Sequence, residues 1–169
     1  TDYSTISDIT ISAGATTGTA SFTPTDDSIY EGNETGIVAI STVSGGSATE
    51  DGTQSVTITI TENESSPTVT LATSATSIAE NAGSSLTLTA TSSIVADEDI
   101  TVTITTSGTG TEGTDYSTIS DITISAGDTT GTASFTPSDD SVYEGNETGI
   151  VAIDGVSGAD AAEDGTQSV

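Results

Sequence analysis

Apolar and polar residues alternate strictly along several stretches of the chain. The pattern is clearest in "TITIT" (57–61), "LTLTAT" (86–91) and "ITVTITT" (100–106). A period of two places one face of a β-strand in a core and the other face in water. Threonine suits the wet face because it is both β-branched and polar. These stretches therefore predict half-buried antiparallel strands.

Turn-forming residues separate these stretches, and no segment has a helical repeat of apolar positions. The pattern predicts seven short strands per unit. Their ranges are 68–79, 85–91, 99–106, 119–125, 131–136, 147–154 and a final strand represented by 54–61. Short strands at this spacing are typical of an antiparallel β-sandwich of immunoglobulin-like size. We therefore expect an all-β protein made of such sandwiches in tandem.

The chain contains a long internal repeat. Residues 1–56 align without a gap on residues 114–169, with 48 of 56 positions identical and a period of 113 residues. The polar break Ser65-Ser66-Pro67 marks a seam between units. Residues 1–66 are then the C-terminal portion of one repeat, and 67–169 are a nearly complete second repeat that lacks most of its last strand. Because part of a sandwich exposes strand edges, we expect the chain to be a segment of a longer array.

Charge excludes several classes of function. The chain has 26 acidic residues, no lysine, arginine or histidine, and a net charge of −26. Such a charge repels nucleic acid and anionic lipid. Without histidine or cysteine, the chain contains no Ser-His-Asp or Cys-His nucleophile and no imidazole or thiolate zinc site. No apolar run approaches the roughly 18 residues of a membrane span, so we expect no membrane insertion of this segment.

The acidic residues concentrate at strand ends and in loops. The clearest cluster is "TDDSIYEGNET" (25–35), which returns as "SDDSVYEGNET" (138–148). Calcium takes six to eight oxygen ligands and tolerates irregular loops, whereas magnesium demands stricter geometry. Acidic loops that meet at one end of the sandwich would therefore favour Ca²⁺. The competing interpretation is a solvated acidic surface, and it is the one that we prefer for Asp97, Glu98 and Asp99.

The order of motifs resembles a known family. "ENAG" (80–83), "GTDYS" (113–117), "ITISAGDTTGTASFTP" (122–137), "DDSVYEGNE" (139–147) and a strand ending in "ENE" (62–64) are similar to the Calx-beta domain, which is abundant in large bacterial surface proteins. The resemblance implies calcium ligands at the end of the sandwich where the chain leaves. The implied ligand positions are Asp2, Asp26, Asp27, Glu31, Glu34, Glu62, Asn63, Glu64, Glu80, Asp115, Asp139, Asp140, Glu144 and Glu147.

Three functions remain open at this stage. The first is a calcium-binding structural repeat of an extracellular stalk, adhesin or surface filament, in which Ca²⁺ stiffens the junctions between repeats. Its partners would be neighbouring repeats and, in a filament, like chains. The second is a calcium-dependent module that binds a glycan or protein, and the third is a metal-free acidic spacer. We do not expect an enzyme, because a catalytic site is rarely copied in tandem. We expect Tyr30 and Tyr143 to pack in the core or at sheet ends.

Overall fold

The computed structural model describes residues 2–169. The chain divides into two compact units. Unit 1 contains the chain up to Ser28 together with Glu34–Ile60, and unit 2 contains Ile29–Asn33 and Thr61–Val169. No helix within the described residues is long and apolar enough to cross a bilayer.

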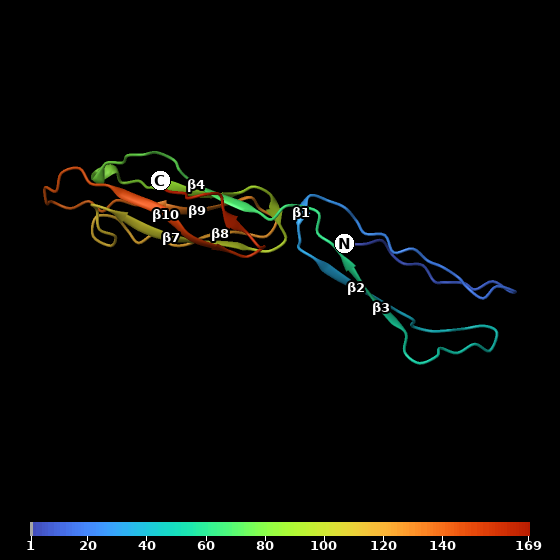
Figure 1. Cartoon of the computed structure of the whole chain (residues 1–169). Helices are drawn as coiled ribbons and strands as arrows, with labels where there is room; N and C mark the ends of the chain where they lie inside the picture. The colour runs from blue at the N-terminus through green and yellow to red at the C-terminus, as the bar shows by residue number, and fades with distance from the viewer. Residues whose placement is uncertain (1) are drawn as a thin grey trace. The chain divides into compact units, whose positions relative to one another are not determined.

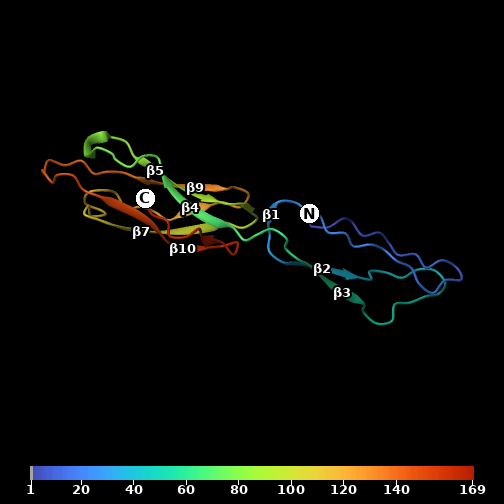
Figure 2. The ribbon, with the colours of Figure 1, turned by 45° about the horizontal axis from the view of Figure 1, so that its top comes forward.

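Unit 2 is a β-sandwich of two sheets (Figures 1 and 2). One sheet has the order β11-β4-β5-β9, formed by Ala162–Glu163, Thr68–Thr73, Leu86–Ser92 and Thr130–Phe135. The other has the order β10-β7-β8, formed by Gly149–Ser157, Ile100–Gly108 and Ile122–Ile124. Every pairing in these sheets is antiparallel except that of β11 with β4. The predicted all-β sandwich is confirmed.

The core of unit 2 consists of the apolar positions of the alternating stretches. Leu88 and Ala90 of β5 and Ile100 and Val102 of β7 are almost completely buried. The threonines between them are exposed or only half-buried. Further buried positions are Val69, Leu71, Ile122, Ile124, Ala133, Val151 and Ile153. Burial of such side chains supplies most of the stability of a sandwich of this kind.

The strand predicted at 68–79 is shorter in the structure, where β4 ends at Thr73. Just beyond this end, the Thr73 hydroxyl donates to the carbonyl oxygen of Ala75 at 3.0 Å. A short 3₁₀ helix, η1, follows at Glu80–Ala82 and is closed by Gly83 in the left-handed region, with φ 62°. The strand predicted at 119–125 is limited to β8, Ile122–Ile124. The strand predicted at 147–154 is β10, which continues to Ser157 past a register shift between Ile153 and Gly155.

Three very short strands were not predicted, namely β11 in the first sheet of unit 2 and the pair β1 and β6. β1, Ile29–Tyr30, pairs in parallel with β6, Val95–Ala96. The N–H of Asp97 donates to the carbonyl oxygen of Tyr30 at 3.1 Å and continues this pairing. The segment Ile29–Asn33 thus belongs to unit 2, although its sequence is that of the first repeat.

Unit 1 contains the hairpin of β2, Glu34–Ala39, and β3, Ser55–Ile60. Elsewhere in the unit, Tyr3 forms an isolated bridge with Pro24 and packs against Phe22, with ring centroids 4.6 Å apart. Several large apolar side chains of the unit are exposed, namely Ile9, Ile11, Ile37, Ile40, Val43 and Val56. A hairpin has too few strands to bury both of its faces.

Candidate metal centre

Three carboxylates from two loops of unit 2 meet at one end of the sandwich. Asp115 lies between β7 and β8, and Glu144 and Glu147 lie between β9 and β10. Each offers an oxygen atom, and these atoms all lie within 4.8 Å of one another. Oxygen ligands at about 2.3–2.6 Å from one Ca²⁺ can be at most about 5 Å apart. The spacing therefore fits a shared calcium ion.

A second group shares one of these residues. Glu80, Asp140 and Glu144 also offer oxygens that lie within 4.8 Å of one another. The N–H of Asp140 donates to Glu80 Oε1 at 3.1 Å, which ties η1 to the loop after β9. Because Glu144 belongs to both groups, the two form one continuous acidic centre that joins three separate loops.

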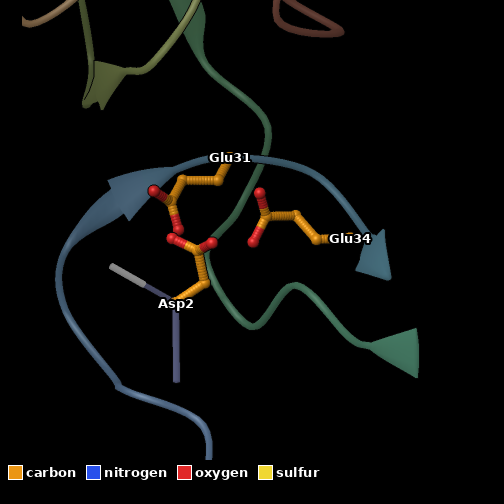
Figure 3. A group of neighbouring side chains, drawn as sticks. All are labelled: Asp2, Glu31 and Glu34. Atoms are coloured by element: carbon orange, nitrogen blue, oxygen red, sulfur yellow. The ribbon is translucent and has the colours of Figure 1, made fainter. Parts of the chain in front are cut away.

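The first repeat brings together the corresponding carboxylates. Asp2, Glu31 and Glu34 precede Asp115, Glu144 and Glu147 by one period of 113 residues. Their oxygens also lie within 4.8 Å of one another, and Figure 3 shows the three carboxylates facing one another. All three are half-buried, whereas Glu144 and Glu147 are exposed. The same three-residue group therefore forms in both copies.

An aromatic pair beside the site positions these loops. Tyr116, next to Asp115, stacks on Phe135 with ring centroids 4.6 Å apart. Gly149 lets the Phe135 ring lie against the start of β10, because a Cβ at this position would be 2.8 Å from Phe135 Cε2. The first repeat has the same arrangement in Tyr3, Phe22 and Gly36.

Backbone contacts fix the Asp115 carboxylate. The N–H of Thr111 donates to Asp115 Oδ2 at 2.6 Å. The N–H of Ser138 donates to the carbonyl oxygen of Asp115 at 2.9 Å, which joins this loop to the end of the strand that carries Phe135. These contacts hold the Asp115 carboxylate and connect its loop to the segment that follows β9.

The electrostatics of the centre favour a cation. Partial desolvation, and then repulsion from Asp115, Asp140, Glu147 and Glu80, raises the pKa of Glu144. Partial desolvation and the nearby Asp115 likewise raise the pKa of Glu147. The chain contains no lysine, arginine or histidine that could relieve this repulsion. A bound divalent ion would lower both pKa values, because it stabilises the ionised form.

The remaining acidic positions of these loops lie outside the three-carboxylate groups. Asp139 lines a small hollow of about 150 Å³ with Glu80, Asn81 and Pro137. Asp26 and Asp27 lie in the loop before β1, and no such group among residues 2–169 includes them. Asp27 corresponds to Asp140, but a counterpart of Glu80 one period earlier would precede the first residue of the sequence.

Glu62 accepts four backbone hydrogen bonds. Its Oε2 receives the N–H groups of Glu31 and Gly32, both at 2.7 Å. Its Oε1 receives those of Asn63 at 2.7 Å and Glu64 at 2.9 Å. The N–H of Glu64 first, and then those of Glu31 and Gly32, outweigh the opposing effect of burial and lower the pKa of Glu62 to about 2.

An ionised carboxylate has about four acceptor positions, so these bonds occupy the capacity of Glu62. Its own N–H donates to Asn33 Oδ1 at 2.9 Å. Glu62 therefore fastens the segment Ile29–Asn33, and Asn63 and Glu64 support it through their backbone.

Sequence reasoning overlooked Glu112. Its carboxylate accepts the Thr106 hydroxyl at 2.7 Å and the Ile119 N–H at 2.9 Å. The hydroxyl contact first, and then the N–H, lowers the pKa of Glu112. Glu112 lies three residues before Asp115 and so steadies the loop that carries it. Asp99, assigned to the solvated surface, accepts the N–H of Ala126 at 2.8 Å.

The expectation for the two tyrosines is right for one and wrong for the other. Tyr30 is buried, with 7% of its surface exposed, whereas Tyr143 is 96% exposed. The two residues occupy the same position of the repeat. Only the segment around Tyr30 is covered by other parts of the chain, so local sequence alone gave no signal of the difference.

Comparison with known proteins gives one family. The sequence model of the Calx-beta domain matches residues 1–64 and, a second time, residues 62–167. Neither a curated protein nor a solved structure is significantly similar to the chain. The two consecutive matches together span nearly the whole sequence.

Proposed function

The chain belongs to the Calx-beta domain family, and from this membership we propose that it is a calcium-binding structural repeat of an extracellular stalk, adhesin or surface filament. Calx-beta domains are β-sandwich modules associated with calcium binding, and the family is structural rather than enzymatic. The observation that carries the proposal is the recurrence of one three-carboxylate group, Asp2, Glu31 and Glu34 in the first repeat and Asp115, Glu144 and Glu147 in the second.

The residues of unit 2 suited to hold calcium are Glu80, Asp115, Asp140, Glu144 and Glu147. Calcium supplies positive charge that the polypeptide itself lacks. These residues come from three loops, so neutralising them removes a repulsion that pushes the loops apart. Because Glu144 is shared between the two groups, occupation of one group also reduces the repulsion felt by the other.

A structural role agrees with the repetition of the site. Near-identical copies suit a structural repeat, because the number of copies sets the length of the protein. In arrays of repeats, stiffness depends on the contacts between neighbouring copies. Glu31 belongs to the acidic group of the first repeat, and Glu62, just before the Ser65-Ser66-Pro67 seam, binds its N–H. Calcium at Glu31 would thus reinforce a segment that Glu62 already fastens. We propose that this reinforcement stiffens the junctions.

Calorimetry of metal-free protein tests the calcium site. Ca²⁺ should bind with a dissociation constant of about 10⁻⁴ to 10⁻³ M, typical of extracellular modules, and raise the melting temperature. Glu144→Gln keeps the size of the side chain but removes a ligand common to both groups, so it should weaken binding strongly. Asp97→Asn removes the same charge away from both groups and is the control. Equal affinities of the two variants would support a solvated acidic surface instead.

The stalk role requires a separate measurement. A chain of three complete periods is compared by small-angle scattering with and without calcium. Calcium should narrow the distribution of maximum dimensions, because the junctions become stiffer. Identical distributions in the two conditions would contradict stiffening, even where calorimetry shows that calcium binds.

A further inference from the structure

Unit 2 holds the segment Ile29–Asn33 through a set of specific contacts. Besides the parallel pairing of β1 with β6, the Tyr30 hydroxyl donates to Asp160 Oδ2 at 2.9 Å. Ser66 Oγ lies 3.4 Å from the Tyr30 hydroxyl oxygen and donates to it. Glu62 binds the next two N–H groups of the segment, as described above. The tyrosine ring is thus buried and its polar end has partners, which is what a buried phenol requires.

The second repeat carries the same segment without a cover. Val142–Asn146 reads VYEGN where Ile29–Asn33 reads IYEGN. Every residue from 139 to 150 is exposed, including Val142 at 61% and Tyr143 at 96%. Exposing an aromatic ring and an adjacent valine to water costs free energy. In the other copy, the corresponding tyrosine ring is buried. The same five-residue motif is therefore held by other parts of the chain at Ile29–Asn33 and is exposed to solvent at Val142–Asn146.

We propose that Val142–Asn146 is a docking segment for a further copy of the repeat. The copy would receive Tyr143 as unit 2 receives Tyr30, with its counterparts of Val95–Ala96 pairing with Val142–Tyr143 and its counterpart of Asp160 accepting the hydroxyl. This inference rests on the proposed role as a tandem structural repeat, but it does not depend on calcium.

The contacts of Ile29–Asn33 indicate that the partner of Val142–Asn146 is another copy of the repeat. The bound copy shows which groups the segment requires, and these groups lie between Glu62 and Asp160, within one period of 113 residues. In the described chain, the receiving surface at β6 is already filled by Ile29–Tyr30. The occupant of Val142–Asn146 must therefore be a copy whose receiving surface is open.

The receiving loop has a specific feature. Asp160 has a left-handed backbone, with φ 49°, and its carboxylate accepts the Tyr30 hydroxyl. Aspartate tolerates that region better than most residues. The first repeat has Ser47 at the corresponding position, so the carboxylate acceptor is a property of the second repeat and is not shared by all copies.

The test adds one period to the chain by placing a copy of residues 57–169 after Val169. Tyr143→Phe and Tyr30→Phe are each made in the original and in the extended chain, in metal-free buffer. Tyr30→Phe removes a hydrogen bond to a carboxylate, so it should destabilise the fold and raise the equilibrium constant for unfolding about tenfold in both chains. Tyr143→Phe should be silent in the original chain and should reach a similar loss only in the extended chain.

Amide hydrogen exchange gives a second readout that needs no variant. The N–H groups of Glu144 and Gly145 should exchange fast in the original chain and become protected in the extended chain, as those of Glu31 and Gly32 are by Glu62. Continued fast exchange, or a silent Tyr143→Phe in the extended chain, would overturn the proposal. Both measurements are made without calcium, so their outcome is independent of whether the acidic groups bind the ion.

Discussion

Glu62→Gln is the sharpest test of the contacts that hold Ile29–Asn33. The substitution keeps the size of the side chain but replaces one acceptor oxygen by an NH₂ group. The NH₂ group is a donor and cannot accept a hydrogen bond from the two backbone N–H groups that the replaced oxygen now binds. Its own N–H groups would instead face those backbone N–H groups. The variant should therefore lose at least two of the four hydrogen bonds.

The size of the effect follows from the pKa of Glu62. A fall from 4.5 to about 2 corresponds to an upper limit of about 3.4 kcal/mol in favour of the ionised form, at 1.36 kcal/mol per pKa unit. Because Glu62 is only half-buried, water screens part of this energy, and we expect about 1–2 kcal/mol. A depressed carboxyl pKa stabilises the fold fully above pH 4.5, and this stabilisation is lost as the pH falls towards 2.

Urea unfolding of both proteins in metal-free buffer at pH 7, 4.5 and 2.5 measures this difference. The free energy of unfolding of Glu62→Gln should lie below that of the parent by about 1–2 kcal/mol at pH 7, and the gap should shrink at pH 2.5. Asp97→Asn, which removes one exposed charge, should show a smaller and nearly constant difference. A gap of the same size at pH 7 and 2.5 would refute the assignment of the four bonds to the ionised carboxylate.

Three further outcomes follow from the described contacts. Gly149→Ala should destabilise unit 2 by about 1–3 kcal/mol, because the new Cβ would lie 2.8 Å from Phe135 Cε2, and it should also weaken calcium binding. Thermal melts measure the loss of stability, and Ser134→Ala, at an exposed position of β9, is the control. The pKa values of Glu144 and Glu147 are raised, so metal-free protein should gain stability from this pair as the pH falls from 7 towards 4.5. The rise in melting temperature caused by calcium should accordingly shrink over that range, and an unchanged rise would contradict it. Glu112→Gln should lower calcium affinity through the Asp115 loop, and calorimetry should show a smaller loss than for Glu144→Gln.

Alternation of apolar residues was sufficient to predict the core of unit 2. Leu88, Ala90, Ile100 and Val102 are buried as the period of two requires, because the pleat alone decides which face each side chain takes. Strand ends were less predictable. β4 ends at Thr73, six residues before the predicted end at residue 79.

The acidic loops illustrate what sequence cannot resolve. Asp115, Glu144 and Glu147 lie close together, whereas Glu62, a residue of the same chemical type, accepts backbone N–H groups. Its role depends on Gly32, whose φ of 71° belongs to the turn that presents two N–H groups to one oxygen. Tyr30 and Tyr143 differ because burial depends on residues far away in the sequence.

The pairing of Ile29–Tyr30 with Val95–Ala96 also determines how an array of such repeats can grow. The two surfaces are different, so the contact is heterologous and has a direction, and repetition of it gives an open series without closure. A ladder of two residues on each side is too small to hold separate molecules together at micromolar concentration. Within one polypeptide the two surfaces meet at an effective concentration in the millimolar range. In the proposed array, the number of repeats in one polypeptide would therefore set its length, and the concentration of the protein would not.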